Sequence, residues 1–126
     1  MKHPALPFES RFHERAGLRQ HYLDAGSGDP VVMLHGNPSW SFFYRNLAAL
    51  LQERCRVIVP DHLGCGLSDK PQDYPYRLAS HIANLEHLLG ALQIDKLSLV
   101  VHDWGGAIGM GYAVRHHEQI NSLVIF

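Results

Sequence analysis

An aspartate, Asp103, stands at the position of this sequence that is best suited to chemistry. The apolar run Leu97–Val101 is predicted to be a buried strand, and Ala107–Tyr112 is predicted to begin a helix. The residues between them include Gly105 and Gly106 and predict a sharp turn. A strand, a turn with a reactive side chain at its tip and a helix together make a nucleophile elbow.

Serine is the usual residue in the middle of such an elbow, within the pattern G-x-S-x-G. Here the five residues read V-H-D-W-G, so that Asp103 replaces the serine. A carboxyl group with an ordinary pKa of about 3.9 is ionised at neutral pH and needs no base to become a nucleophile. The aspartate therefore favours attack by a carboxylate on a saturated carbon, and it disfavours acyl transfer by a serine hydrolase.

Simpler interpretations of the residues around this elbow stay open at this point. Aspartate is a favoured N-cap of a helix, so Asp103 could have a capping role. Trp104 could serve packing alone, and Asn37, which precedes a proline, could belong to an ordinary turn. We interpret His35 and His102, which flank the expected site, as hydrogen-bonding residues that orient their loops and not as bases.

Short apolar runs alternate with segments of helical spacing along the chain. The runs are Val31–Leu34, Arg56–Val59, Leu97–Val101 and Leu123–Phe126, and the helical spacing occurs within Phe43–Leu51, within Leu78–Leu92 and after the elbow. Ahead of them, Phe8–Glu14 and Leu18–Asp24 predict a β-hairpin. Buried strands that alternate with helices predict an α/β fold whose mostly parallel sheet has about six strands and is flanked by helices.

Three loops follow strands of this predicted sheet: His35–Trp40, Asp61–Pro71 and the elbow. Because reactive groups gather at the carboxyl ends of the strands in such sheets, we expect the three loops to lie together. In the second loop, five residues are expected to fix a tight conformation that supports the first loop. They are Asp61, Gly64, Gly66, Ser68 and Asp69.

The three loops, in this order and at this spacing, resemble the α/β-hydrolase superfamily and, within it, the haloalkane dehalogenase group. The matching stretches are H-G-N-P, P-D-x-x-G-x-G-x-S-D-K-P and V-H-D-W-G-G. The resemblance covers residues 1–126 and implies an incomplete α/β-hydrolase core domain, the N-terminal part of that fold without its cap domain and last strands. Phe126 also stops inside a predicted strand, and for this reason too we expect a longer parent protein.

The resemblance also implies roles for three residues. Asp103 would be the catalytic nucleophile that displaces halide and forms an alkyl-enzyme ester. The side chains of Asn37 and Trp104 would bind the halide through two N–H donors. In the family, a histidine and an acid that lie further along the chain complete the reaction by hydrolysis. We therefore expect residues 1–126 alone to form the ester without turning over.

Other functions stay open beside haloalkane dehalogenation. The loop P-D-H-L-G-C-G-L-S-D looks particularly like that of β-lactone decarboxylases of olefin biosynthesis, which share the aspartate elbow. Epoxide hydrolases also use an aspartate. A truncated protein without catalytic activity is the alternative from a different class.

Composition narrows the possible partners. The 126 residues are 46% hydrophobic and have 11 basic and 12 acidic side chains, so the chain is expected to be globular and shows no sign of nucleic-acid binding. No run is long enough for a signal peptide or a membrane span. The two cysteines predict reduced thiols in the cytoplasm, and no spacing predicts a metal or another cofactor. The expected partner is a small apolar substrate.

Overall fold

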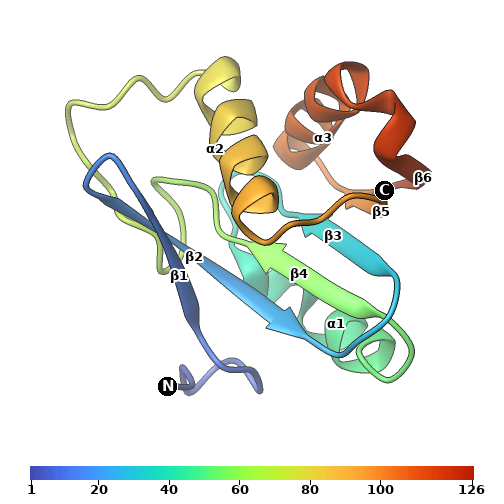
Figure 1. The fold of residues 1–126 in the computed structure, drawn as a ribbon. Helices are drawn as coiled ribbons and strands as arrows, with labels where there is room; N and C mark the ends of the chain where they lie inside the picture. Colours follow the sequence, from blue (N-terminus) through green and yellow to red (C-terminus); the bar gives the residue numbers. More distant parts are fainter.

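The computed structural model describes residues 1–126 as a six-stranded sheet in the order β1-β2-β4-β3-β5-β6 (Figure 1). The four strands β4, β3, β5 and β6 are parallel, and β2 pairs antiparallel with both β1 and β4. The strand bounds are β1 Arg11–Arg15, β2 Leu18–Ala25, β3 Pro30–Leu34, β4 Arg56–Pro60, β5 Leu97–Val101 and β6 Ile120–Ile125. This architecture confirms the predicted mostly parallel α/β sheet.

Helices cover both faces of the sheet. The 3-10 helix η1 (Ser41–Tyr44) and helix α1 (Arg45–Leu51) lie on one face, and α2 (Leu78–Ala91) and α3 (Trp104–Arg115) lie side by side on the other (Figure 1). A short 3-10 helix, η2 (His117–Gln119), leads into β6. Parallel strands that are covered on both faces have to be apolar on both sides, which explains the continuous apolar runs.

The alternation of side chains along each strand divides the core in two. Val32 and Leu34 on β3 pack with α2 and α3, whereas Met33 between them packs with Tyr44 and Ala48 on the opposite face. All five side chains are 0–2% exposed. Deletion of a large side chain in either layer therefore leaves a cavity beside the sheet.

The structure corrects two details of the predicted elements. Strand β1 begins at Arg11, because Phe8 leaves the hairpin and is buried in the core layer beneath α1. In the first helical segment, Phe43 and Leu50 of the predicted apolar spacing are exposed. Tyr44 points inward instead, and its hydroxyl donates a hydrogen bond to the carbonyl oxygen of Leu34.

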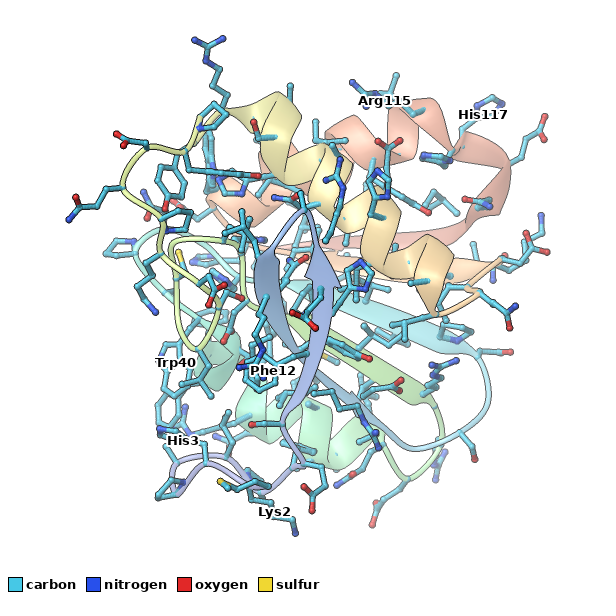
Figure 2. The ribbon with its side chains drawn as sticks, turned by 60° about the vertical axis from the view of Figure 1, so that its left-hand side comes forward. Lys2, His3, Phe12, Trp40, Arg115 and His117 are labelled. Carbon is cyan, nitrogen blue, oxygen red and sulfur yellow. The ribbon has the colours of Figure 1, made fainter.

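The N-terminal segment is held against the loop after β3. The rings of His3 and Trp40 meet edge to face with their centroids 5.4 Å apart, and both lie on the same side of the molecule in Figure 2. Cys55 and Cys65 are both unpaired thiols. None of the helices combines the length and the hydrophobicity that a bilayer crossing requires.

Candidate active site

The elbow places Asp103 in an unusual backbone conformation between β5 and α3. Its φ of 55° and ψ of −125° lie in a region that residues with a Cβ rarely adopt. Asp103 occupies the N-cap position of α3, but its side chain makes no capping hydrogen bond. The capping interpretation therefore does not explain why an aspartate stands here, and the strained turn exposes its carboxylate.

Glycine is required directly after the elbow. A Cβ on Gly105 would collide with the carbonyl oxygens of Leu34 and His35, the latter at 2.6 Å. Helix α3 can therefore start close to the end of β3 only because residue 105 has no side chain. This close approach brings the elbow beside the H-G-N-P loop.

The carboxylate of Asp103 is solvent-exposed and receives hydrogen bonds from backbone N–H groups. The Asn37 N–H donates to Oδ2 at 3.0 Å, and this bond, followed by one from the Trp104 N–H, lowers the pKa of Asp103 below its usual value. Asp103 forms no salt bridge with a basic side chain. The group is thus ionised at neutral pH and has no cation to neutralise it.

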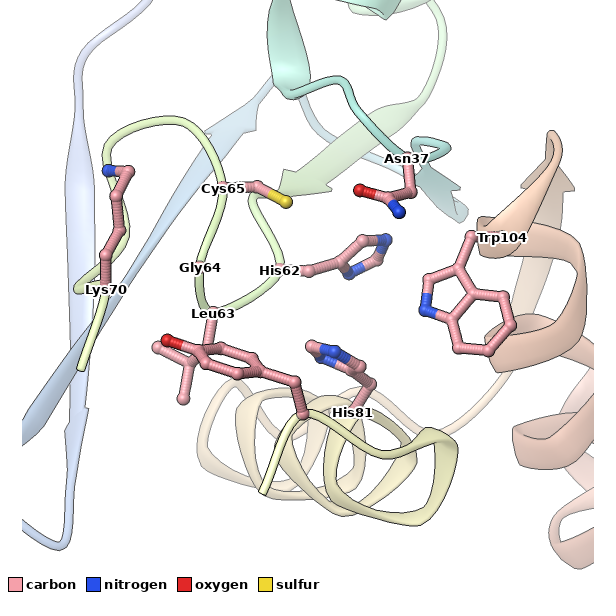
Figure 3. Close-up of a pocket in the computed structure, with 9 residues that line it drawn as sticks. Asn37, His62, Leu63, Gly64, Cys65, Lys70, His81 and Trp104 are labelled. Carbon is pink, nitrogen blue, oxygen red and sulfur yellow. The ribbon is translucent and has the colours of Figure 1, made fainter. Parts of the chain in front are cut away.

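A cavity of about 390 Å³ opens beside the elbow and is lined by Asn37 and Trp104, the two predicted halide-binding residues (Figure 3). The amide of Asn37 and the indole nitrogen of Trp104 both face its interior. Trp104 is 39% exposed, so it does not serve core packing alone. Asp103 itself lines a second, smaller hollow of about 210 Å³, together with Asn37, Phe43 and His102.

The loop after β4 is fixed around Asp61, as the sequence predicts. The fully buried Asp61 carboxylate accepts hydrogen bonds from the Ser41 N–H at 2.6 Å and the Leu67 N–H at 2.9 Å, and it pairs with His21 Nδ1 at 2.9 Å. Burial by itself raises the pKa of Asp61, but these bonds outweigh it and the pKa lies below its usual value. Because Ser41 directly follows the H-G-N-P-S-W segment, Asp61 joins the second loop to the first.

Two expectations about histidines have different outcomes. His35 is confirmed as a hydrogen-bonding residue, because its Nδ1 lies 2.7 Å from the Gly36 carbonyl oxygen and its Nε2 accepts a bond from the His62 N–H at 3.0 Å. For His102 the prediction is wrong. Its Nδ1 is buried without a hydrogen-bond partner, and its ring stacks on Phe43 with centroids 4.8 Å apart.

Sequence reasoning missed a group of three buried imidazoles beside the cavity, which comprises His35, His62 and His81. The ring centroids of His35 and His62 are 4.0 Å apart, and those of His62 and His81 are 5.7 Å apart. His81 lies on α2, far along the chain from the other two, so no local motif connects them. One indication of this group is present in the sequence: histidines follow two of the predicted strands, and another lies on the buried face of a predicted helix, where polar residues are uncommon.

Protonation of His62 is expected to destabilise the fold at acidic pH. Burial, with a contribution from neighbouring His35, lowers the pKa of His62 to about 3, although Asp61 acts in the opposite direction. An unfolded imidazole takes up a proton below a pH of about 6.5, whereas the folded one does not, so stability is lost as the pH falls below that value. The loss due to His62 is expected to reach about 2 kcal/mol by pH 5.

Urea unfolding between pH 7 and pH 5 measures this loss. His62→Gln keeps a donor near the His35 carbonyl but cannot be protonated, so its unfolding free energy is expected to fall less steeply with pH than that of the wild type. Equal pH slopes for the two proteins would contradict the assignment. Arg11→Gln, on the exposed edge strand, is the surface control.

The family model described as alpha/beta hydrolase fold matches residues 29–125, which contain strands β3 to β6, the elbow and the three loops, but not the hairpin β1-β2. The chain belongs to the α/β hydrolase fold family.

Three curated relatives align with nearly all of this α/β hydrolase chain. A cis-3-alkyl-4-alkyloxetan-2-one decarboxylase of Shewanella oneidensis is 57% identical over 95% of the chain, and one of Xanthomonas campestris is 48% identical over 99%. Haloalkane dehalogenase 2 of Mycobacterium tuberculosis is 38% identical over 94%. The aligned region is 39%, 45% and 42% of these relatives, so the chain spans about two fifths of their length.

Solved structures agree with this assignment. The haloalkane dehalogenase DatA of Agrobacterium tumefaciens superposes on 99% of the chain with a TM-score of 0.90 at 31% identity. The epoxide hydrolase CorEH superposes on 94% with a TM-score of 0.87 at 33% identity. The chain covers 43% and 41% of these two structures. The predicted fold, the N-terminal portion of an α/β hydrolase, is thereby confirmed.

Proposed function

We propose that the complete protein carrying this sequence is a β-lactone decarboxylase that acts on oxetan-2-ones, with Asp103 as the nucleophile. The observation that carries the proposal is the environment of Asp103, an ionised carboxylate without a cation beside it, which lines the smaller hollow together with Asn37 and lies between Asn37 and Trp104 of the larger cavity. The two relatives with 57% and 48% identity are named for oxetan-2-one decarboxylation, which supports this substrate class.

The chemistry of a β-lactone suits a carboxylate nucleophile. C4 of the ring is a saturated carbon that bears the ring oxygen as a leaving group, so an oxygen of Asp103 can bond to it as the C4–O bond breaks. The electron pair passes to the ring oxygen and completes a carboxylate. Asn37 and Trp104 face the cavity with N–H donors that can stabilise this developing charge.

The second step regenerates the nucleophile. The bond between C3 and the carboxylate breaks, its electron pair forms the alkene, and carbon dioxide leaves. At the same time the bond from C4 to Asp103 breaks and returns its electron pair to the aspartate. This sequence consumes no water, so it needs no base to hydrolyse an ester at Asp103.

Haloalkane dehalogenation is the second candidate function. One observation that favours it is that Asn37 and Trp104 direct two N–H donors into one cavity, as halide binding requires. The other is the dehalogenase that is 38% identical to this chain. The alkyl ester at Asp103 would then have to be hydrolysed by water, which requires a general base. Epoxide hydrolysis, the activity named for CorEH, requires a general base in the same way.

The two unpaired cysteines favour a reducing compartment, and we include a cytoplasmic location in the proposal.

Product analysis of the complete protein, expressed from its full reading frame, separates these functions. With a cis-3,4-dialkyloxetan-2-one we expect an alkene and one carbon dioxide per turnover, and no ¹⁸O from labelled water in the alkene or in Asp103. A dehalogenase would release bromide from 1-bromobutane and incorporate ¹⁸O into the alcohol or into Asp103. Sustained bromide release without decarboxylation would overturn the proposal.

Loss of either cavity donor is expected to slow the reaction more than it weakens binding. Asn37→Leu and Trp104→Phe each remove an N–H that stabilises charge formed in the transition state, so kcat is expected to fall about 100-fold with a small change in KM. Steady-state carbon dioxide release measures both constants. Trp40→Phe, which leaves the elbow unchanged, is the control for tryptophan replacement. A rise in KM with unchanged kcat in Trp104→Phe would exclude a transition-state role.

A further inference from the structure

The wall of the cavity that α2 forms contains a histidine whose hydrogen bonding is incomplete. His81, on the first turns of α2, is 8% exposed, and its Nδ1 is buried without a partner. Its ring lines the cavity beside that of His62 (Figure 3). A proton on the inaccessible Nδ1 would have no acceptor, so the ring carries its proton on Nε2, which makes no hydrogen bond within the protein. Nε2 is therefore the atom of His81 that is available to a polar ligand in the cavity.

The neighbouring imidazoles cannot supply the donor that such a ligand needs. His35 holds its proton on Nδ1, which faces the Gly36 carbonyl, because its Nε2 accepts the His62 N–H. His62 holds its proton on Nε2, which donates to the His35 carbonyl at 2.9 Å. The protons of both rings are thus committed to the backbone, and of the three imidazoles only that of His81 is left to donate into the cavity, beside the donors Asn37 and Trp104.

Other donors of the cavity wall are also engaged with the protein. Lys70 Nζ donates to the carbonyl oxygens of Gly66 and Ser68, and the Tyr76 hydroxyl donates to that of Pro71. Burial lowers the pKa of His81, which leaves its ring neutral at pH 7 with one N–H. A neutral donor in a half-apolar cavity suits an uncharged carbonyl oxygen better than a free anion.

We propose that His81 determines specificity for the lactone by donating a hydrogen bond from Nε2 to its exocyclic carbonyl oxygen, in the cavity that Asn37 and Trp104 also line. The inference rests on the proposed function and names the group that recognises its substrate class. As Asp103 bonds to C4 and the C4–O bond breaks, the carbonyl becomes part of a carboxylate and keeps this hydrogen bond. Because the donor carries no charge, it does not hold the carboxylate as an ion pair would, and carbon dioxide can leave.

The test compares His81→Phe and His81→Gln in the complete protein. Phenylalanine keeps the aromatic contacts with His62 and Tyr76 but cannot donate, and kcat/KM for a cis-3,4-dialkyloxetan-2-one is expected to fall about tenfold. Glutamine restores an N–H, and most of the loss should be recovered. His87→Phe, on the exposed face of the same helix, is the matched control. Equal kcat/KM values for wild type and His81→Phe would overturn the inference.

A binding measurement that requires no turnover separates this inference from the proposed function. Cys65 lines the same cavity, so the reactivity of its thiol reports whether the cavity is occupied. Cys55 is not part of the lining, so its thiol is the control for a general change in reactivity. A 3,4-dialkylcyclobutanone, which has the carbonyl but no ring oxygen to expel, is expected to protect Cys65 from methyl methanethiosulfonate. His81→Phe should need about a tenfold higher concentration for half-protection.

The combined outcomes are decisive. If the wild type decarboxylates the lactone and His81→Phe alters neither kcat/KM nor Cys65 protection, the inference is wrong and the proposed function stands. If the wild type does not decarboxylate the lactone but protection depends on His81, the carbonyl site stands and the proposed function is wrong. If protection is independent of His81 as well, both are wrong.

Discussion

Asp103→Asn in the complete protein is expected to lower kcat for decarboxylation by at least about 10⁴-fold, the largest effect of any single substitution considered. An amide has no ionised oxygen with which to bond to C4, and the proposed reaction has no other nucleophile. The fold should be retained, because asparagine has the shape of aspartate and keeps a side-chain oxygen that can accept the Asn37 N–H. Single-turnover carbon dioxide release measures the loss, and thermal unfolding measures the stability.

Controls for this substitution are available on the same chain. Asp95→Asn removes an exposed carboxylate from the turn before β5 and is expected to leave kcat unchanged. A mass increase equal to one substrate molecule, localised to residue 103 of the wild type during turnover and absent from Asp103→Asn, would support the covalent step. Activity of Asp103→Asn within tenfold of the wild type would eliminate Asp103 as the nucleophile.

Gly105→Ala is expected to destabilise the protein by more than about 3 kcal/mol, the largest effect on stability among our predictions. The new Cβ would collide with two backbone carbonyl oxygens, those of Leu34 and His35. Backbone atoms at the end of a central strand cannot rotate away as a flexible side chain can. Helix α3 would therefore have to shift away from β3, which would also displace Asp103 from the Asn37 N–H.

The next residue provides a matched control. A Cβ on Gly106 would meet only a Val101 methyl group at 3.9 Å, an ordinary contact. Gly106→Ala lies in the same helix and is expected to be neutral or to stabilise by up to about 1 kcal/mol, because alanine favours helix more than glycine does. Urea unfolding compares the two variants, and equal effects would contradict the argument from close approach.

The sequence was sufficient to predict those parts of the site that depend on local pattern. Apolar runs located the central strands, and the loops that follow them were correctly expected to meet at one edge, where Asn37 and Trp104 now line one cavity. Asp61 was correctly predicted to be one of the residues that fix a supporting loop, but its central place among the hydrogen bonds was not predicted. These predictions succeed because the length and apolarity of buried strands determine where their carboxyl ends lie.

Side-chain contacts between distant segments could not be predicted in this way. His81 contacts His62 because of the way α2 is turned about its own axis where it packs on the sheet. The spacing of apolar residues alone does not determine this orientation closely enough to predict a contact between two side chains. The same uncertainty explains why Tyr44, and not Phe43, turned out to face the core. His102 was expected to form hydrogen bonds. Instead its ring stacks on that of Phe43, and its Nδ1 has no hydrogen-bond partner.

The contact between His21 and Asp61 connects the antiparallel hairpin to the loops of the candidate site, although the hairpin contributes no reactive group. His21 lies on β2, and Asp61 holds the amides of Ser41 and Leu67, so three segments converge on one buried carboxylate. Local opening of the hairpin would release both loops at once. We therefore expect the edge of the sheet and the loops after β3 and β4 to open as one cooperative unit and not separately.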